Sequence, residues 1–338
     1  MSEDLKEHAN RECILEVKTG SHLYGTNTPD SDEDYVGIFL PPKEYIIGLK
    51  NVEEVDLSTV SVGKDGKNTS DAIDRKMYEF RKFVNLALGN NPNILEILFA
   101  NEENILHVNH YGERLLDIRH CFPSQLCVKK FLEYAKSQKH KMIIRSDKHN
   151  ELNYGYGFLK TLPDKMTMSE VILEPQNKMR SVINDVSSSV IPCFMKRQSH
   201  IHCGDVCFEP GVYVKKARKI LKERIDKATN RSDLILKHGY DTKFASHLIR
   251  LLFEGLTLVR TGKLEFPLPE VRVLKEIRNG KWETEKVIAF ADGLVGTIED
   301  AVKTTVLPKT PNYKQIEHLV ICTNLEWLNR TTHRAFRF

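Results

Sequence analysis

The sequence lacks the long hydrophobic run that a membrane-spanning helix needs, and its first residues, Met1–Lys6, lack the apolar core of a signal peptide. Cysteine is also scarce. The seven cysteines are an odd number, irregularly spaced, in a chain too long to need disulfides for stability. We therefore expect reduced thiols, a cytoplasmic location and no membrane partner.

The Walker signature Gly-x-x-x-x-Gly-Lys-Ser/Thr is absent too, which excludes a P-loop ATPase. Positive and negative charges are nearly balanced. The sequence contains 50 Lys and Arg and 46 Asp and Glu, which give a net charge of +4. Such a balance permits nucleic-acid binding without requiring it. With 41% hydrophobic residues, the 338 residues suffice for one large or two moderate globular domains.

Positive charge gathers in the middle third of the chain. From Lys139 to Arg231 there are 18 Lys and Arg against 10 Asp and Glu, a net of about +8, so the remainder carries about −4. One interpretation is an evenly solvated basic face. The alternative is a surface that contacts the phosphates of RNA.

The most informative stretch runs from Thr19 to Gly37. Apolar runs before and after it predict two strands that flank a Gly20-Ser21 turn and a group of acids. Asp32 and Asp34 are two residues apart, so at the start of a strand they would share one face. Neighbouring carboxylates repel each other unless a cation lies between them. The alternative is an ordinary acidic surface turn.

A Gly-Ser turn suits phosphate binding, because glycine lets the backbone approach closely while the serine hydroxyl and backbone N–H groups donate. Together with two carboxylates, it indicates a triphosphate held between the turn and two metal ions. Asp74 is the candidate third carboxylate, with Asp71 and Glu79 as competitors. A cluster that offers only oxygen ligands favours Mg²⁺.

Apolar periodicity predicts how the rest of the chain folds. We expect strands at residues 13–18, 36–40 and 72–77, and more loosely over 52–62. The helical period favours helices at 78–88, 109–118, 124–142, 214–227, 240–262 and 283–302. Residues 143–210 have weak periodicity and predict short strands and loops, whereas the tail at 313–330 fits either a strand or a helix.

The motif residues resemble a known signature. Gly20-Ser21, ten intervening residues and Asp32-x-Asp34 resemble the DNA polymerase β-type nucleotidyltransferase superfamily. The strings at 20–26 and 31–37 narrow the resemblance to nucleotidyltransferases assigned to an RNA repair pathway in bacteria and bacteriophages. The resemblance covers roughly residues 13–142 and 236–295, and leaves 143–235 unmatched.

This resemblance implies a mixed α+β fold: a small polymerase-β-like sheet with flanking helices, and a mainly helical C-terminal part. We expect a catalytic domain at residues 1–120 and a helical domain at 121–338, with a basic insertion at about 143–235. The implied reaction transfers a nucleoside monophosphate from an NTP to a hydroxyl and releases pyrophosphate. The expected acceptor is RNA, with a tRNA end as one candidate, contacted through residues 139–231.

The resemblance also assigns residues. Two Mg²⁺ or Mn²⁺ ions would be held by Asp32, Asp34 and Asp74. The residues that would contact the NTP are Gly20, Ser21, Lys243, His247 and Arg250. The last three are spaced to lie on one face of a helix, so surface residues beside an apolar stripe are the alternative.

Several alternatives stay open. The acceptor hydroxyl could belong to a protein, or the fold could be a nucleotide- or RNA-binding module without activity. A zinc site is conceivable at Cys193, His200, His202, Cys203 and Cys207, although the spacing is looser than in zinc ribbons. Tyr154-Gly155-Tyr156-Gly157 could stack on bases or form a plain loop.

Overall fold

The computed structural model describes residues 3–29, 31–59, 73–181, 189–226, 235 and 237–335. The sequence also predicts a hairpin-type turn at residues 63–68. That turn and the competitor Asp71 lie outside the described residues. The chain divides into two compact units. Unit 1 comprises Met1–Tyr134, Arg250–Lys275 and Asp292–Phe338, and unit 2 comprises Ala135–Ile249 and Glu276–Ala291. The proposed assignment of catalysis to residues 1–120 stays a prediction.

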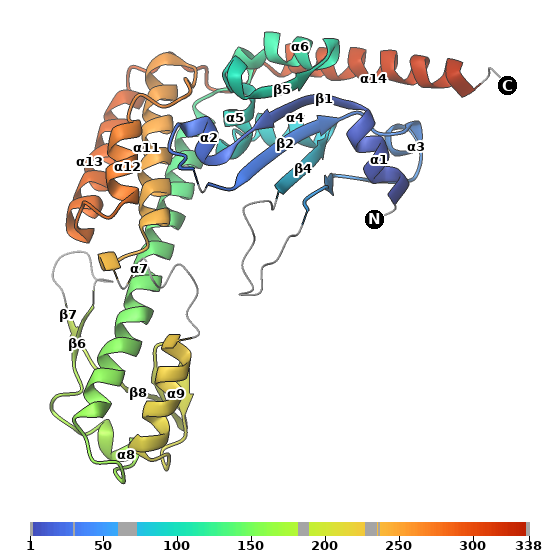
Figure 1. Cartoon of the computed structure of the whole chain (residues 1–338). Helices are drawn as coiled ribbons and strands as arrows, with labels where there is room; N and C mark the ends of the chain where they lie inside the picture. Colours follow the sequence, from blue (N-terminus) through green and yellow to red (C-terminus); the bar gives the residue numbers. More distant parts are fainter. Residues whose placement is uncertain are drawn as a thin grey trace. The chain divides into compact units, whose positions relative to one another are not determined.

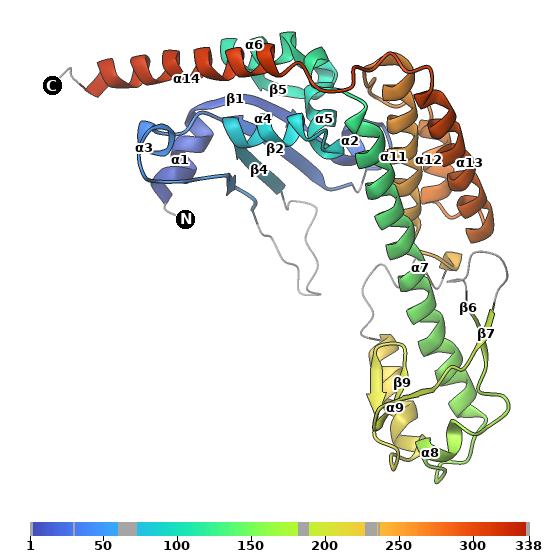
Figure 2. The ribbon, with the colours of Figure 1, turned by 180° about the vertical axis from the view of Figure 1, so that it is seen from behind.

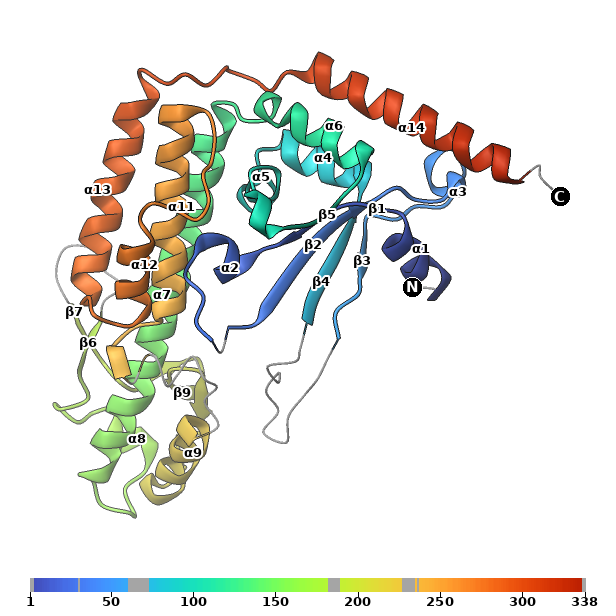
Figure 3. The ribbon, with the colours of Figure 1, turned by 45° about the horizontal axis from the view of Figure 1, so that its top comes forward.

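Unit 1 contains a five-stranded mixed sheet in the order β3-β4-β2-β1-β5. Its strands are β1 (Cys13–Lys18), β2 (Glu33–Phe39), β3 (Glu54–Asp56), β4 (Ile73–Glu79) and β5 (Ile105–Val108). Neighbouring strands are antiparallel except for β2 and β4, which are parallel. The fan of strands is clearest in Figure 3.

Helices cover the two faces of this sheet unequally. The N-terminal helices of unit 1 are α1 (Glu3–Arg11), α2 (Gly20–Tyr24), α3 (Lys43–Ile46), α4 (Phe80–Leu88), α5 (Pro92–Leu98) and α6 (His110–Asp117). On one face, α1 packs Leu5 and Ala9 against Phe39 and Met77. The other face is contacted by α4 and α6, as the view in Figure 3 shows. The two 3-10 helices are Glu102–Asn104 and Arg119–Cys121.

The last part of the described chain, from residue 242 on, is mainly helical. Its helices are α11 (Thr242–Thr261), α12 (Val271–Arg278), α13 (Thr284–Val302) and α14 (Tyr313–Ala335). The tail, which the sequence left between strand and helix, is thus helical. It lies along α6 (Figures 1 and 3). Trp327 is buried and donates from Nε1 to the carbonyl oxygen of Pro41 at 2.8 Å, which fixes α14 to the segment after β2.

Unit 2 has its own hydrophobic core. Its elements are the C-terminal part of α7 (Leu126–Lys160), α8 (Met168–Val171), α9 (Val214–Asp226) and short strands. The strands are β6 (Met179–Ser181), β7 (Ser189–Ile191), β8 (Met195–Arg197), β9 (His200–Cys203) and β10 (Val206–Phe208). They form a two-stranded and a three-stranded sheet, and α8 and α9 lie beside α7 (Figures 1 and 2).

The expectation of loops at residues 143–160 was wrong, because α7 continues to Lys160. Glycine has a low helix propensity, so Gly155 and Gly157 led to the prediction of loops in this part of the chain. Packing explains why the helix forms. A Cβ atom on residue 155 would lie 2.5 Å from Sγ of Cys203, so Gly155 lets the strands of unit 2 approach α7 closely. The predicted mixed α+β fold itself is confirmed.

Candidate active site

Two of the predicted carboxylates meet on neighbouring strands. In the parallel pair of β2 and β4, Asp34 and Asp74 are direct register partners. Direct partners project to the same face of a sheet, so the two carboxylates lie on one side, opposite α1. Asp32 is exposed and comes immediately before β2, two residues from Asp34. Asp74 accepts a hydrogen bond from Ser58 Oγ at 3.2 Å.

The Gly20-Ser21 turn lies directly against this acidic pair. Gly20 has a φ of +64°, and a Cβ atom at this position would overlap with Oδ2 of Asp34. The backbone N–H of Thr19 donates to the carbonyl oxygen of Asp34 at 2.8 Å. Only glycine combines a left-handed φ with this close approach. The turn and the carboxylate predicted to cooperate are therefore neighbours.

Helix α2, which carries Gly20 and Ser21, is anchored to a buried charge cluster. The hydroxyl of Tyr24 donates to Oε2 of Glu96 at 2.6 Å. The Arg250 guanidinium pairs with Oε1 of Glu96 and, at 2.7 Å, with Oε1 of Glu254. Its Cζ atom lies 4.0 Å from the centre of the Tyr24 ring. These contacts fix the end of α2 inside unit 1.

Burial governs the protonation of this cluster. Burial, and then the neighbouring Glu96 carboxylate, raise the pKa of Glu254 well above its usual range, against the opposing effect of Arg250. Burial also raises the pKa of the Tyr24 phenol. A protonated Glu254 leaves one guanidinium opposite one carboxylate, so the cluster is neutral, as a site without water requires.

The three residues of α11 that were predicted to contact the NTP differ in exposure and in the compact unit to which they belong. Arg250 is only 3% exposed, and its partners are Glu96 and Glu254. Lys243 is exposed and His247 half-buried in the first turns of α11, which belong to unit 2. The NTP-binding roles of these three residues stay predictions. The sequence did not reveal the acidic partners of Arg250, although Glu254 follows it by four residues, a spacing that pairs charges on a helix.

The opposite face of the sheet holds a second polar group. Lys18 pairs with Glu33 at 2.6 Å, and Tyr35 donates to the same carboxylate. These contacts lower the pKa of Glu33, whereas burial and then Glu33 raise the pKa of Tyr35 to about 12. The period of two in β2 separates this group from Asp34. Glu33 therefore does not join the candidate metal ligands.

His22 lies one residue after Ser21. Its Nε2 atom is buried without a hydrogen-bond partner in the described part of the chain. Burial, and then nearby Lys18, lower its pKa, so the ring is neutral at physiological pH.

The acids fit a divalent cation through their chemistry. Asp32, Asp34 and Asp74 offer only oxygen atoms, which Mg²⁺ prefers, and the pairing of β2 with β4 places two of them side by side. In the described ranges, however, no group of three His, Cys, Asp or Glu side chains is arranged to hold a metal ion. Phosphate oxygens and water molecules supply the remaining ligands of Mg²⁺ in sites that offer one or two carboxylates.

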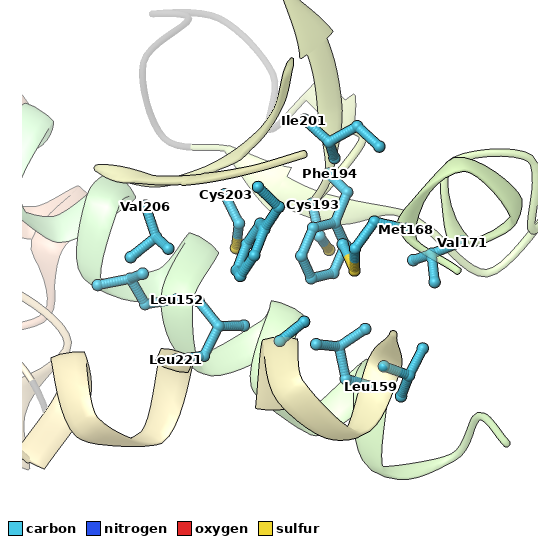
Figure 4. Close-up of a cluster of buried hydrophobic side chains, with 13 residues drawn as sticks. Leu152, Leu159, Met168, Val171, Cys193, Phe194, Ile201, Cys203, Val206 and Leu221 are labelled. Carbon is cyan, nitrogen blue, oxygen red and sulfur yellow. The ribbon is translucent and has the colours of Figure 1, made fainter. Parts of the chain in front are cut away.

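The candidate zinc residues of unit 2 are not gathered around one point. Cys193 and Cys203 belong to the hydrophobic cluster around Phe194 (Figure 4). Burial raises the pKa of Cys193 to about 11 and raises that of Cys203 further, so both are protonated thiols in the chain without metal. Cys203 donates to the carbonyl oxygen of Glu151 at 3.1 Å.

Comparison with known proteins indicates which proteins the chain is similar to. Residues 1–162 match the model of the RNA repair pathway DNA polymerase beta family. The chain is also 25% identical over 337 residues to an uncharacterized 38.9 kDa protein of the nrdC-mobD intergenic region of Enterobacteria phage T4. That match covers 96% of this chain and 98% of the phage protein. No solved structure matches the chain.

The family match confirms the resemblance that the Gly-Ser and Asp-x-Asp motifs indicated, and the phage relative supports a bacteriophage context. A family related to DNA polymerase β suggests nucleotidyltransferase activity. Among the described residues, no helix is both long and apolar enough to cross a membrane.

Proposed function

We propose that this protein transfers a nucleoside monophosphate from an NTP to a hydroxyl group of RNA. The oxygen of the acceptor hydroxyl forms a bond to the α-phosphorus, the bond from that phosphorus to the β-phosphate bridging oxygen breaks, and pyrophosphate leaves. The observation that carries the proposal is the contact of the Gly20 turn with Asp34, whose register partner is Asp74.

Asp32, Asp34 and Asp74 would hold the divalent cations, Mg²⁺ or Mn²⁺. When bound, such cations neutralise the charge that builds up on the phosphates. Asp74 would accept the proton of the acceptor hydroxyl. Two observations support this role: the residue is exposed, and Ser58 donates a hydrogen bond to one of its carboxylate oxygens. The backbone at Gly20 and the hydroxyl of Ser21 would donate to the phosphates.

Arg250 acts indirectly in this proposal. Its guanidinium holds Glu96, Glu96 accepts from Tyr24, and Tyr24 ends the helix that begins at Gly20. Arg250 is therefore a positioning residue for the turn. Lys243 and His247 remain proposed contacts of the triphosphate or base.

RNA is the proposed acceptor on two grounds. The matched family is named for an RNA repair pathway, and residues 139–231 carry a net charge of about +8 that suits a phosphate backbone. A tRNA end is one acceptor of this kind.

The decisive experiment supplies each of the four NTPs, labelled at the α-phosphate, with Mg²⁺ and either an RNA pool or a protein pool. We expect label on RNA with the wild-type protein and at least a 100-fold lower rate with Asp34→Asn. Asp117→Asn, an exposed aspartate at the end of α6, is the matched control and should retain wild-type activity. Label on protein would show that the acceptor hydroxyl belongs to a protein and not to RNA. Absence of label in every wild-type reaction, or equal label with Asp34→Asn, would refute the transferase.

A further inference from the structure

Unit 2 contains a pocket of about 400 Å³. One wall comes from α7, where Asn153, Tyr154, Gly157 and Phe158 follow one another at helical spacing and so share a face. The other wall includes Gln176 and Lys178, from the segment that follows α8. The pocket lies entirely within one compact unit.

The second wall is held rigidly. Asn177, between Gln176 and Lys178, is buried, and its side chain makes two hydrogen bonds with the backbone of Phe194. Its Nδ2 donates to the carbonyl oxygen at 2.9 Å, and its Oδ1 accepts from the N–H at 2.7 Å. Because both backbone groups of Phe194 are engaged, the flanking residues 176 and 178 keep fixed positions beside the pocket.

The lining combines flat apolar surface with polar groups. Tyr154 is 54% exposed, so a large part of its side chain is open to a ligand. Gly157 leaves open space, because a Cβ atom there would meet nothing within 4 Å. The amide of Gln176 and the ammonium group of Lys178 are exposed beside these surfaces. An aromatic face, an amide and a cation are what a nucleobase with its phosphate requires.

Charge favours a nucleic acid over a protein as the occupant. The pocket lies in the segment with a net charge of about +8. Lys178 is the charged residue among those that line the pocket. A phosphate backbone that passes the pocket would therefore meet a positive surface.

We propose that this pocket binds an unpaired base of single-stranded RNA, stacked on Tyr154, with its phosphate near Lys178. The proposal goes beyond the transfer reaction and does not depend on it, since binding is measured without an NTP. A nucleobase linked to a phosphate could also come from a free nucleotide, so the test separates these two sources.

The test measures the fluorescence anisotropy of a labelled 12-nucleotide RNA with the full-length protein. Tyr154→Ala should weaken binding about tenfold, as the loss of one stacked base does. Gly157→Leu places a side chain in the pocket and should weaken binding at least as much. A Cβ atom there would meet nothing within 4 Å, so the fold should be preserved. Gly296→Leu is the matched control, because this helical glycine of α13 also faces open space, and it should bind as wild type does.

Two further measurements sharpen the result. Lys178→Gln should reduce the slope of log affinity against log salt by about 0.7, the value for one phosphate contact on a single strand. The same RNA in a duplex should bind more weakly, because its bases are stacked and paired.

Several outcomes would overturn the proposal. One is RNA binding that Tyr154→Ala and Gly157→Leu leave unchanged. Another is Tyr154-dependent binding of UMP or AMP without binding of the RNA, which would make this a free-nucleotide site. A third is displacement of the RNA by an acidic peptide in a Tyr154-dependent manner, which would assign the pocket to a protein partner. If the transfer assay failed while RNA binding persisted, the proposed transferase activity would be refuted. The proposal of an RNA-binding pocket would still hold.

Discussion

Gly20 lies so close to the carboxylate of Asp34 that a side chain at position 20 would overlap with Oδ2. Its φ of +64° adds a second constraint, because side chains other than glycine adopt this conformation at a cost of about 1–2 kcal/mol. We therefore expect Gly20→Ala to reduce the free energy of unfolding by about 1–2 kcal/mol, as measured by urea denaturation. Its effect on transfer should be larger, at least 100-fold, because the displaced group is a proposed metal ligand.

Gly211→Ala provides the control for that substitution. Gly211 has a negative φ, and a Cβ atom there meets nothing within 4 Å. It should therefore lose neither stability nor activity. If Gly20→Ala retained full transfer activity, the contact between the turn and Asp34 would have no part in the reaction.

The buried cluster around Arg250 makes stability depend on pH. The pKa of Glu254 is raised in the folded protein, so the folded state binds a proton that the unfolded state releases above its ordinary pKa of about 4.5. The contribution of Glu254 to the free energy of unfolding is therefore fully present below that pH. It decreases as the pH rises toward the folded-state pKa. One proton gives a slope of at most about 1.4 kcal/mol per pH unit.

Urea denaturation between pH 4.5 and 8 measures this slope. Glu254→Gln keeps the shape of the protonated acid and cannot titrate, so it should flatten the dependence and be at least as stable as wild type at pH 8. Equal slopes for wild type and Glu254→Gln would show that Glu254 is ionised in the folded protein.

Substituting Arg250 tests whether its guanidinium stabilises the fold or binds the nucleotide. Removing a partner from a buried ion pair leaves uncompensated charge and costs about 3–5 kcal/mol. We expect Arg250→Met to lower the unfolding free energy by about this amount, and Tyr24→Phe by about 1–2 kcal/mol through the lost hydrogen bond to Glu96. Tyr313→Phe, at an exposed tyrosine, is the control for the latter.

The opposite result for Arg250 is equally informative. If Arg250→Met folded with wild-type stability and raised only the KM for NTP, the guanidinium would serve the nucleotide, as the resemblance implied. A loss of stability in proportion to the loss of activity supports the positioning role.

The sequence predicted the part of this site that is local in the chain. Gly20-Ser21 and Asp32-x-Asp34 lie within one stretch, and the alternation of a strand was enough to place Asp34 on a definite face. The register that makes Asp74 its partner depends on a parallel pairing across 40 residues of separation, which periodicity does not determine. Asp74 was named only as a candidate third carboxylate on an expected strand, with Asp71 and Glu79 as competitors.

Tertiary contacts explain what the sequence missed. The helix through Gly155 and Gly157 forms against its local propensity, because Gly155 accommodates Cys203. The acidic partners of Arg250 include Glu96, which is 154 residues away, and no local pattern marks such a pair. Long-range packing decided both cases.

The cysteines of unit 2 yield a final prediction, one that tests zinc directly. Cys207 is exposed, whereas Cys193 and Cys203 are buried with raised pKa values. A thiol reagent such as DTNB should therefore label Cys207 rapidly in the native protein, and Cys207→Ser should remove that phase. Because the two buried thiols pack as apolar side chains, EDTA should leave the Tm unchanged, within about 1 °C, while it removes the cations that the proposed transfer would use. A lowered Tm together with release of one equivalent of zinc would instead establish a structural zinc site in unit 2.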